Sequence, residues 1–588
     1  MSVPYDRPIV GHHSDQSARR SIPPVPRYIH SAADLPRNQL GTSDRWLTGL
    51  AYAVVVVPFL LALIRLLAAP TAHLTLPDDL ALIDLHTRRA LAWKQQLGVF
   101  DHFNWNHPGP TYFYALSLVY RALGSGTRSL FVGATLLNGL AAAACVAVVR
   151  RRTTPGRALW AAMWIGALGI VLAAAGPAST TYSESVLGAL VSPWNPTVVL
   201  FPLLLTLLLC AGAVDRSGVS LVGALLVASF VVQTDISTLP VAAALVAVAA
   251  IVWSVALVWG RRRPGDPAGG HRGHGTVLAV AGLVALVVLW LPPLIQQWTN
   301  HPGNVRLIWR FFTASHPGQS LSVSLWSVAA AGAVVVVGPG EVMRSILGGT
   351  PAHAALSVAV SLLTLAVAAV TVAVAARERA RFAVGVGVLV IVGWVASVVA
   401  VTHVVGFVFG YLVLWVVVMP IAALIGMGMV RLPVPAERAT VVRVGLCVVS
   451  LVVGVVLCIR VLAIPSLAEA ADPQVARLAA LVEPHLAPGG RVMVGDAGAG
   501  TTDTQLLDTE EFIGLVNVLD QRGRHPTVNP FWKAEFGPGF LSDGHEDRLV
   551  GLSTWTPASP GRPDYVGRVG DMAVTVTDRS GAAVPVTR

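Results

Sequence analysis

Residues 76–114 read LPDDLALIDLHTRRALAWKQQLGVFDHFNWNHPGPTYFY and form the densest polar segment before the C-terminal tail. Carboxylates, arginines, tryptophans and one lysine are interleaved there with an Asn-His-Pro-Gly-Pro corner. The rest of the first three-quarters of the chain consists mostly of Ala, Val, Leu and Gly. We therefore expect any chemistry of this protein to lie in residues 76–114.

The overall composition is that of a membrane protein. Of the 588 residues, 54% are hydrophobic and 12% are charged, and the mean hydropathy is +0.67. Soluble domains average about 25% charged residues. Repeated apolar runs of about 20 residues match bilayer-spanning helices, in which each peptide group is satisfied within its own helix. The sequence predicts a mostly α-helical, polytopic membrane bundle.

The net charge of +10 arises from arginines in short clusters between the apolar runs. This distribution is typical of the positive-inside bias and of contact with anionic lipids, and it does not indicate nucleic-acid binding. The four cysteines lie inside apolar runs and show neither metal-ligand spacing nor a disulfide framework. We expect them to be small buried hydrophobic residues: Cys145, Cys210, Cys447 and Cys458.

Run lengths and the arginine bias predict eleven spans of the plasma membrane. They lie at about 47–69, 128–149, 158–176, 197–214, 218–233, 239–259, 275–293, 353–376, 383–401, 406–429 and 443–464. The apolar segment 321–338 is predicted to be re-entrant or interfacial. Counting it as a span would put Arg377, Arg379 and Arg381 outside the cell.

The chain is predicted to have three regions. Residues 1–45 are Pro-rich and polar, as expected of a disordered cytoplasmic tail. Residues 46–464 form the membrane domain, with a first outer loop at 70–127 whose segment 110–123 is a helix at the outer interface. Residues 465–588 have a soluble composition and predict a small extracytoplasmic α/β domain, with strands at 491–495 and 572–576 and a helix at 508–523.

Asp78 and Asp79 are the first candidates for catalysis. Pro77 can occupy the first helical position, which puts both carboxylates in the first turn, where the helix dipole favours them. This position in the helix accounts for both carboxylates without any catalytic function. Desolvating a charge at the outer edge of the membrane is costly, however, and a carboxylate there is suited to accept a proton from an alcohol. We therefore favour a general base.

Other polar residues leave two interpretations open. Asp84 and Arg88 are spaced i,i+4 and can pair on one helix face, but the planar guanidinium of Arg88 also suits a phosphate. Asp235, at an outer corner beside Gln233, is either a solvated loop carboxylate or a group that lines a cavity. The aromatic residues are either sugar or prenyl contacts or members of interfacial belts: Trp105, Tyr112 and Trp194.

Together these elements resemble the GT-C superfamily of membrane glycosyltransferases, especially the branch of protein O-mannosyltransferases and aminoarabinose transferases. Its members tend to carry an Asp-Glu-x-x-Tyr-x-x-x-Ala-Arg motif, a His/Lys-Pro-Pro-Leu corner, a Tyr-rich interfacial helix and an Arg opening the second span. Asp79 and Arg88 have the matching separation, 107–110 (His-Pro-Gly-Pro) replaces the corner, and Arg128 opens the second span. Leu80 stands where the Glu would be. The similarity covers roughly residues 47–300.

The resemblance implies an inverting transferase that moves a sugar from a polyprenyl-phosphate donor to a hydroxyl of a cell-envelope glycan or lipid. It implies no organic cofactor and leaves a divalent metal open, although the sequence shows no metal-ligand set. Asp79 would act as the base, with Asp78 beside it. The implied substrate contacts are Arg88, Asn106, His107, Arg128, Gln233, Asp235, Arg306 and Arg310. Arg306 and Arg310 equally fit a basic interfacial helix with aromatic anchors.

A transporter or a flippase for lipid-linked glycans is the main alternative. Such proteins favour inverted repeats and charged or broken helices near the middle of the bilayer. The sequence shows no convincing repeat, and nearly all polar clusters lie at the ends of the apolar runs. This distribution favours the transferase.

Overall fold

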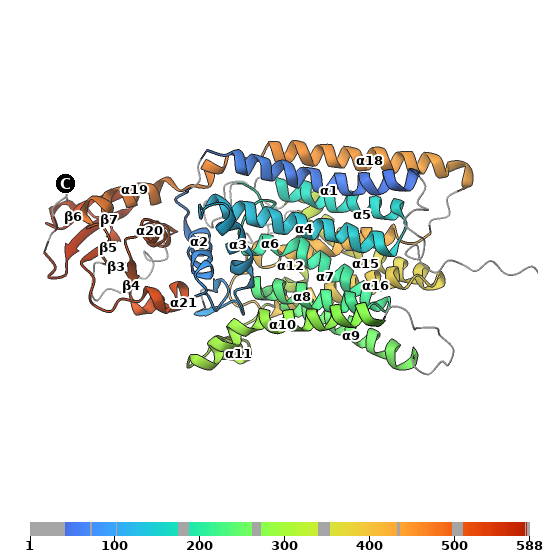
Figure 1. Cartoon of the computed structure of the whole chain (residues 1–588), viewed down its shortest axis with the longest axis horizontal. Helices are drawn as coiled ribbons and strands as arrows, with labels where there is room; N and C mark the ends of the chain where they lie inside the picture. Colours follow the sequence, from blue (N-terminus) through green and yellow to red (C-terminus); the bar gives the residue numbers. More distant parts are fainter. Residues whose placement is uncertain are drawn as a thin grey trace, which may run out of the picture.

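The computed structural model describes residues 42–70, 73–101, 103–174, 187–260, 272–338, 353–431, 435–496, 510–582 and 584. These residues form a long helical bundle with a smaller α/β domain at one end (Figure 1). We call this end of the bundle the domain end and the opposite end the far end. The predicted fold class is confirmed, whereas most of the predicted tail, residues 1–41, lies outside the described residues.

In the described part of the chain, nine helical stretches are long and apolar enough to cross a membrane. They are α1 (Thr42–Ala68), α4 (Arg128–Arg152), α5 (Pro155–Ala173), α6 with α7 (Asn195–Val198, Leu200–Val214), α9 (Leu239–Gly260), α10 (Arg272–Thr299), α15 (Ala354–Arg377), α16 (Arg381–Thr402) and α18 (Ala436–Leu462). The shorter helices α8 (Gly218–Thr234) and α17 (Val418–Met427) coincide with the two remaining predicted spans. The chain is a multi-pass membrane protein.

The predicted span at 406–429 is a broken helix, which the sequence did not indicate. Two 3₁₀ turns, Gly410–Leu412 and Leu414–Val417, precede α17. Trp415 is fully buried there, and its indole N–H donates to the Ser237 hydroxyl at 3.0 Å. Irregular backbone is tolerated at membrane depth where protein surrounds it, so the tertiary packing stabilises this break.

The apolar segment at 321–338 forms α12 (Leu321–Gly332) and the single turn α13 (Val334–Val337). At 1.5 Å per residue, α12 is about 18 Å long, which is shorter than the roughly 30 Å hydrocarbon core. It packs against α15 and α16. The re-entrant path remains a prediction, because residues 339–352 lie outside the described residues.

Arginines gather at the far end of the bundle. Arg150, in the last turn of α4, donates to the Thr48 hydroxyl near the start of α1 at 3.1 Å. Arg152 forms an ion pair with Asp215, in the turn between α7 and α8, at 2.9 Å. Arg65, at the other end of α1, donates instead to backbone carbonyls at the end of α18, which leads into the C-terminal domain. The positive-inside bias therefore predicts that the far end is cytoplasmic.

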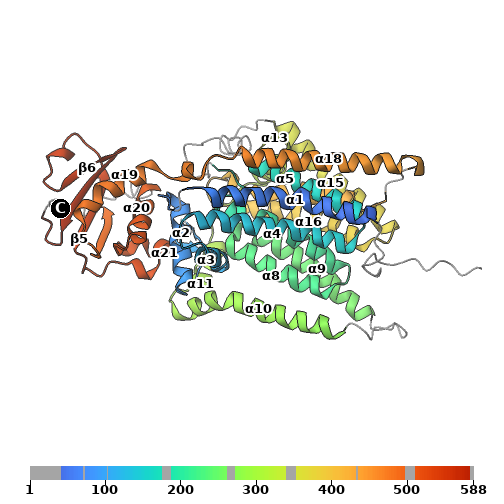
Figure 2. The same cartoon turned by 45° about the horizontal axis from the view of Figure 1, so that its top comes forward.

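Two helices of the first loop lie across the domain end, between the bundle and the C-terminal domain: α2 (Asp78–Leu91) and α3 (Thr111–Ala122) (Figures 1 and 2). A two-stranded ribbon of β1 (Phe100–Asp101) and β2 (Trp105–Asn106) connects them. The short helix α11 (Asn304–Thr313) follows α10 and contacts β2.

The predicted helix at 110–123 is present as α3, but it does not rest at an open interface. Tyr112 and Tyr120 are each no more than 1% exposed. The helix packs against α2, α4 and α8, so these two tyrosine rings face protein.

The C-terminal domain is a five-stranded mixed sheet with helices. Its strand order is β4-β3-β5-β7-β6, with β3 parallel to both neighbours and the remaining pairs antiparallel. The predicted strands at 491–495 and 572–576 and the described part of the helix at 508–523 are confirmed as β3, β7 and α20. The elements are α19 (Pro473–Val482), β3 (Val492–Asp496), α20 (Glu510–Gln521), β4 (Pro526–Val528), α21 (Lys533–Phe536), β5 (Arg548–Thr554), β6 (Tyr565–Val569) and β7 (Met572–Asp578).

Membrane orientation is testable with single cysteines in a variant that lacks the four native ones. Lys94→Cys and Ser580→Cys lie at the domain end and in the C-terminal domain, and Arg438→Cys lies at the start of α18; all three positions are exposed. A membrane-impermeant maleimide is expected to label the first two in intact cells and the third only after permeabilisation. Labelling in the reverse pattern would invert the predicted topology.

Candidate active site

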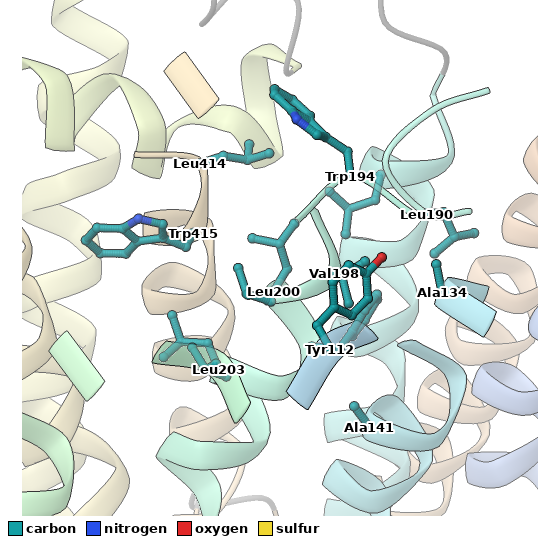
Figure 3. Packing of buried hydrophobic residues seen from close by; sticks show 14 of the residues in the cluster. Tyr112, Ala134, Ala141, Leu190, Trp194, Val198, Leu200, Leu203, Leu414 and Trp415 are labelled. Carbon is teal, nitrogen blue, oxygen red and sulfur yellow. The ribbon is translucent and has the colours of Figure 1, made fainter. Parts of the chain in front are cut away.

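Asp79 lies in the first turn of α2, where its carboxylate meets a tryptophan from a distant segment. The indole N–H of Trp194 donates to Asp79 Oδ2 at 2.8 Å. Trp194 itself is 5% exposed and lies against the Tyr411 ring, with centroids 5.1 Å apart. Figure 3 shows Trp194 above the buried side chains of Leu200 and Val198. One indole thus joins Asp79 to the broken helix before α17.

The residues on either side of Trp194 hold two further parts of the first loop. The Pro193 carbonyl accepts a hydrogen bond from the Tyr112 hydroxyl of α3. The Asn195 side-chain amide lies 3.4 Å from His107 Nε2, and His107 Nδ1 accepts from the Ile236 backbone N–H at 3.1 Å. We call Asp79, His107 and residues 193–195 the Asp79 centre.

Asp78 begins α2 with an unusual backbone. Its φ is +43°, a left-handed value that only a few per cent of non-glycine residues adopt. Pro77 is the extended residue before the helix, not its first helical residue as predicted. Both carboxylates do lie in the first turn. Left-handed strain of this kind concentrates at functional sites, which fits a role for this helix start.

The predicted corner at Gln233 and Asp235 is buried beside His107. Gln233 is fully buried, accepts from the Thr111 hydroxyl and donates to the Leu289 carbonyl at 3.2 Å. A Cβ on Gly109 would overlap the Gln233 amide, so a larger residue there would force the Gln233 side chain to move. The backbone at Gly109 thus lies close against the buried Gln233 side chain.

Asp235 is 4% exposed and accepts from the Ser237 backbone N–H at 3.0 Å, which caps a 3₁₀ turn. The carboxylate is therefore not a solvated loop group, one of the two interpretations that the sequence left open. The next residue, Ile236, donates to His107. The backbone of this corner therefore contacts His107 of the Asp79 centre.

Arg88 forms ion pairs within the protein. It pairs with Asp84 on α2 and with Asp520 on α20, where its Nη2 lies 2.8 Å from Asp520 Oδ2. Its Nη2 also donates to the Asn517 side chain at 2.8 Å. Burial lowers the pKa of Arg88, but the nearby charges of Asp84 and Asp520 outweigh that effect and raise it above its ordinary value. Of the two interpretations, the structure shows the ion pair with Asp84.

The remaining predicted contacts lie apart from Asp79. Asn106 exchanges hydrogen bonds with Asn304 of α11, at 2.8 and 2.7 Å, and donates to the Ala534 carbonyl at 3.1 Å. Arg128 donates to two carbonyls at the end of α1, at 3.2 and 2.9 Å. Arg306 and Arg310 are exposed on α11. These contacts fix helix ends and loops to one another.

The sequence pointed to Trp194 only as one of several aromatic residues, and it missed Asn195 and Arg89 altogether. The Ser-Pro-Trp-Asn-Pro run was a polar interruption before an apolar span, which was the available signal for Asn195. Arg89 follows Arg88 directly, but adjacent helical residues point about 100° apart and so have different neighbours. Within the described ranges, no group of three or more His, Cys, Asp or Glu residues lies close enough to hold a metal ion.

The fold is that of the GT-C membrane glycosyltransferases, so the resemblance seen in the sequence is confirmed at the level of fold. Among solved structures, ArnT from Cupriavidus metallidurans bound to undecaprenyl phosphate matches with a TM-score of 0.51 and 12% identity, over 91% of this chain and 99% of that chain. The same protein in the apo state matches with a TM-score of 0.46 and 13% identity, over 92% and 100%.

The arabinofuranosyltransferase AftD from Mycobacteria matches with a TM-score of 0.31 and 15% identity, over 92% of this chain and 40% of that chain. Searches with the sequence found neither a family model nor a curated protein that matches it. The match with a TM-score of 0.51, at 12% identity, establishes a fold and leaves the reaction to be argued from the site.

Replacing Arg88 tests its structural role. Arg88→Ala leaves the buried Asp84 without its cation, a loss that typically costs about 3–5 kcal/mol. We expect the apparent melting temperature of the purified protein in detergent to fall by about 2–4 °C. Arg477→Ala, at an exposed position of α19, serves as the matched control and is expected to melt like the unaltered protein. An unchanged melting temperature for Arg88→Ala would contradict the structural role.

Proposed function

We propose that this protein is a glycosyltransferase that moves a sugar from a polyprenyl-phosphate donor to an acceptor hydroxyl on the extracytoplasmic side of the plasma membrane. The position of Asp79 carries the proposal. It is a half-buried carboxylate at the domain end, hydrogen-bonded by Trp194 and gathered with His107 around residues 193–195. The GT-C fold and the arginine-rich far end support the reaction class and the orientation.

Asp79 acts in this proposal as the general base. The acceptor oxygen attacks the anomeric carbon of the donor while its proton passes to the Asp79 carboxylate. The bond between the anomeric carbon and the phosphate oxygen breaks, and the phosphate leaves with the electron pair. The Trp194 N–H, which donates to Oδ2, holds the carboxylate in orientation and favours its charged form.

An apolar cavity in the bundle supports the proposal of a lipid-linked donor. It has a volume of about 390 Å³ and lies between the domain-end turns of α1 and α18 and residues 187–191. Its lining is mostly apolar, with Leu66, Val191 and Val461 among the lining residues and Arg65 as their charged neighbour. Val191 lies three residues before Trp194, so the cavity adjoins the segment that contributes Trp194 to the Asp79 centre. ArnT has been solved with undecaprenyl phosphate, a donor carrier of this chemical class.

Substitution of Asp79 tests the base. Asp79→Asn keeps an oxygen that can accept from Trp194 but removes the proton acceptor. We expect sugar transfer in membranes to fall at least 100-fold, as is typical for loss of general base catalysis, while expression and melting temperature persist. Asp571→Asn, at an exposed carboxylate of the C-terminal domain, is the matched control.

Retention of full activity by Asp79→Asn would rule out the base assignment. Translocation of a lipid-linked glycan in proteoliposomes, with no new glycosidic bond formed, would favour the flippase over the transferase.

Trp194→Phe tests the hydrogen bond to Asp79 while keeping an aromatic ring against Tyr411. A hydrogen bond to a charged group contributes about 1.5–3 kcal/mol, so we expect the rate to fall about tenfold or more. Because the N–H stabilises the charged carboxylate, its removal is expected to move the acidic limb of the pH–rate profile to higher pH. Trp298→Phe, at a tryptophan that is 86% exposed, should leave both rate and profile unchanged. A lower rate without a shifted acidic limb would mean that Trp194 acts by packing alone.

A further inference from the structure

A cavity of about 350 Å³ lies between the C-terminal domain and the loops at the domain end. Its lining comes from three parts of the chain: the end of α2 with the loop up to residue 106, the α10–α11 turn, and the region of α21. Neither Asp79 nor Trp194 is among the described residues that line it. We call this cavity the interdomain pocket.

The interdomain pocket carries net positive charge. Arg89, Lys94 and Lys533 line it, and Glu535 is the single carboxylate among its described lining residues. Burial, followed by the charge of Arg89, lowers the pKa of His86 to about 3, so this imidazole is neutral at physiological pH. The described lining therefore has three cationic side chains and one carboxylate.

Arg89 is the distinctive member of this group. Its Nε donates to the Gln95 side chain at 3.2 Å, and its guanidinium lies 5.6 Å from the centre of the Phe540 ring. A Cβ on Gly539 would lie 2.8 Å from Arg89 Nη1, so small residues leave room for the guanidinium. In the part of the chain that the structure describes, no carboxylate lies within ion-pair distance of Arg89.

The neighbouring Arg88 shows what a structural arginine looks like here, because two carboxylates neutralise it. Burial lowers the pKa of Arg89, and the charge of Asp520 offsets this only in part. Burying a cation without a close anion is unfavourable, which points to an anionic ligand as the partner of Arg89.

The rest of the lining suits a hydroxyl-rich molecule. Seven amide side chains contribute to the pocket, and each amide offers both donors and acceptors that can pair with hydroxyl groups. Asn106 and Asn304 already bond to each other, which fixes the pocket wall. The seven are Gln95, Gln96, Asn104, Asn106, Gln296, Asn300 and Asn304.

We infer that the interdomain pocket binds an anionic group, phosphate or carboxylate, on the glycan acceptor, with Arg89 as its principal contact. The inference rests on the proposed function. His86, which lines the pocket, and Asp79 are seven residues apart and share one face of α2, about 10 Å apart along its axis. An acceptor anchored at Arg89 thereby presents a neighbouring sugar to the Asp79 centre.

Binding of soluble probes to the full chain in detergent micelles tests the pocket without requiring turnover. The probes are a glucuronic-acid oligosaccharide, a neutral oligosaccharide of equal length and mannose 6-phosphate. At least one anionic probe is expected to bind at least tenfold more tightly than the neutral one, and the one that binds identifies carboxylate or phosphate. Arg89→Ala is expected to weaken that binding about tenfold or more, since a charge-assisted hydrogen bond is lost. The exposed control Arg477→Ala should bind like the unaltered protein.

Because Arg89 is half-buried, a second variant guards against loss of folding. Lys94 and Lys533 are both exposed, so Lys94→Ala with Lys533→Ala is expected to fold and to weaken anion binding several-fold, with a reduced dependence on salt. Equal binding of neutral and anionic probes, or unchanged binding in both variants, would overturn the inference.

The same preparation separates this inference from the proposed function. Binding of polyprenyl phosphate is expected to persist in Arg89→Ala, because the apolar cavity beside Arg65 is unaltered. If the unaltered protein binds anionic glycans at Arg89 but transfers no sugar, the binding role of the pocket is supported and the proposed reaction is contradicted. If it transfers sugar while Arg89→Ala binds every probe as before, the proposed reaction is supported and the binding role of the pocket is contradicted.

Discussion

The buried carboxylate of Asp84 is the constraint on which the domain end depends. It is fully buried and receives hydrogen bonds from three elements: the Tyr120 hydroxyl of α3 at 2.5 Å, Arg88 of α2, and the Gln521 amide of α20 at 2.7 Å. An unpaired charge at this position would be strongly destabilising, so these partners have to stay in place. Asp520 completes the cluster by pairing with the same arginine. The C-terminal domain is thereby fixed to the first-loop helices.

Fixing α2 in this way sets the positions of two groups with different chemistry. Its first turn carries Asp79 to Trp194, beside the bundle, whereas its last turns carry His86 and Arg89 to the interdomain pocket. In the proposed reaction, the bundle side holds the lipid-linked donor and the domain side holds the acceptor. The C-terminal domain then has a direct part in substrate binding, because Lys533 on α21 lines the pocket.

The sequence predicted the helices, the two strands at 491–495 and 572–576 and the general region of the site, but not the partners of the site residues. Asp79 and Trp194 are 115 residues apart, and neither position indicates the other. Arg88 was equally compatible with an ion pair and a phosphate, because the spacing to Asp84 says nothing about Asp520, 432 residues away. The break before α17 also went unpredicted, since its apolar residues read as one continuous span.

The sequence by itself determined the membrane class, the long helical spans other than 406–429, the helix start at Asp78–Asp79 and the GT-C-like order of elements. These depend on contiguous residues, because a helix must satisfy its own backbone across an apolar core of fixed thickness. Only the tertiary structure decided that Arg88 is neutralised while Arg89 lines a pocket, and that Trp194 meets Asp79. Those outcomes depend on which helices pack together and which charges are buried. The order of residues along the chain indicates neither.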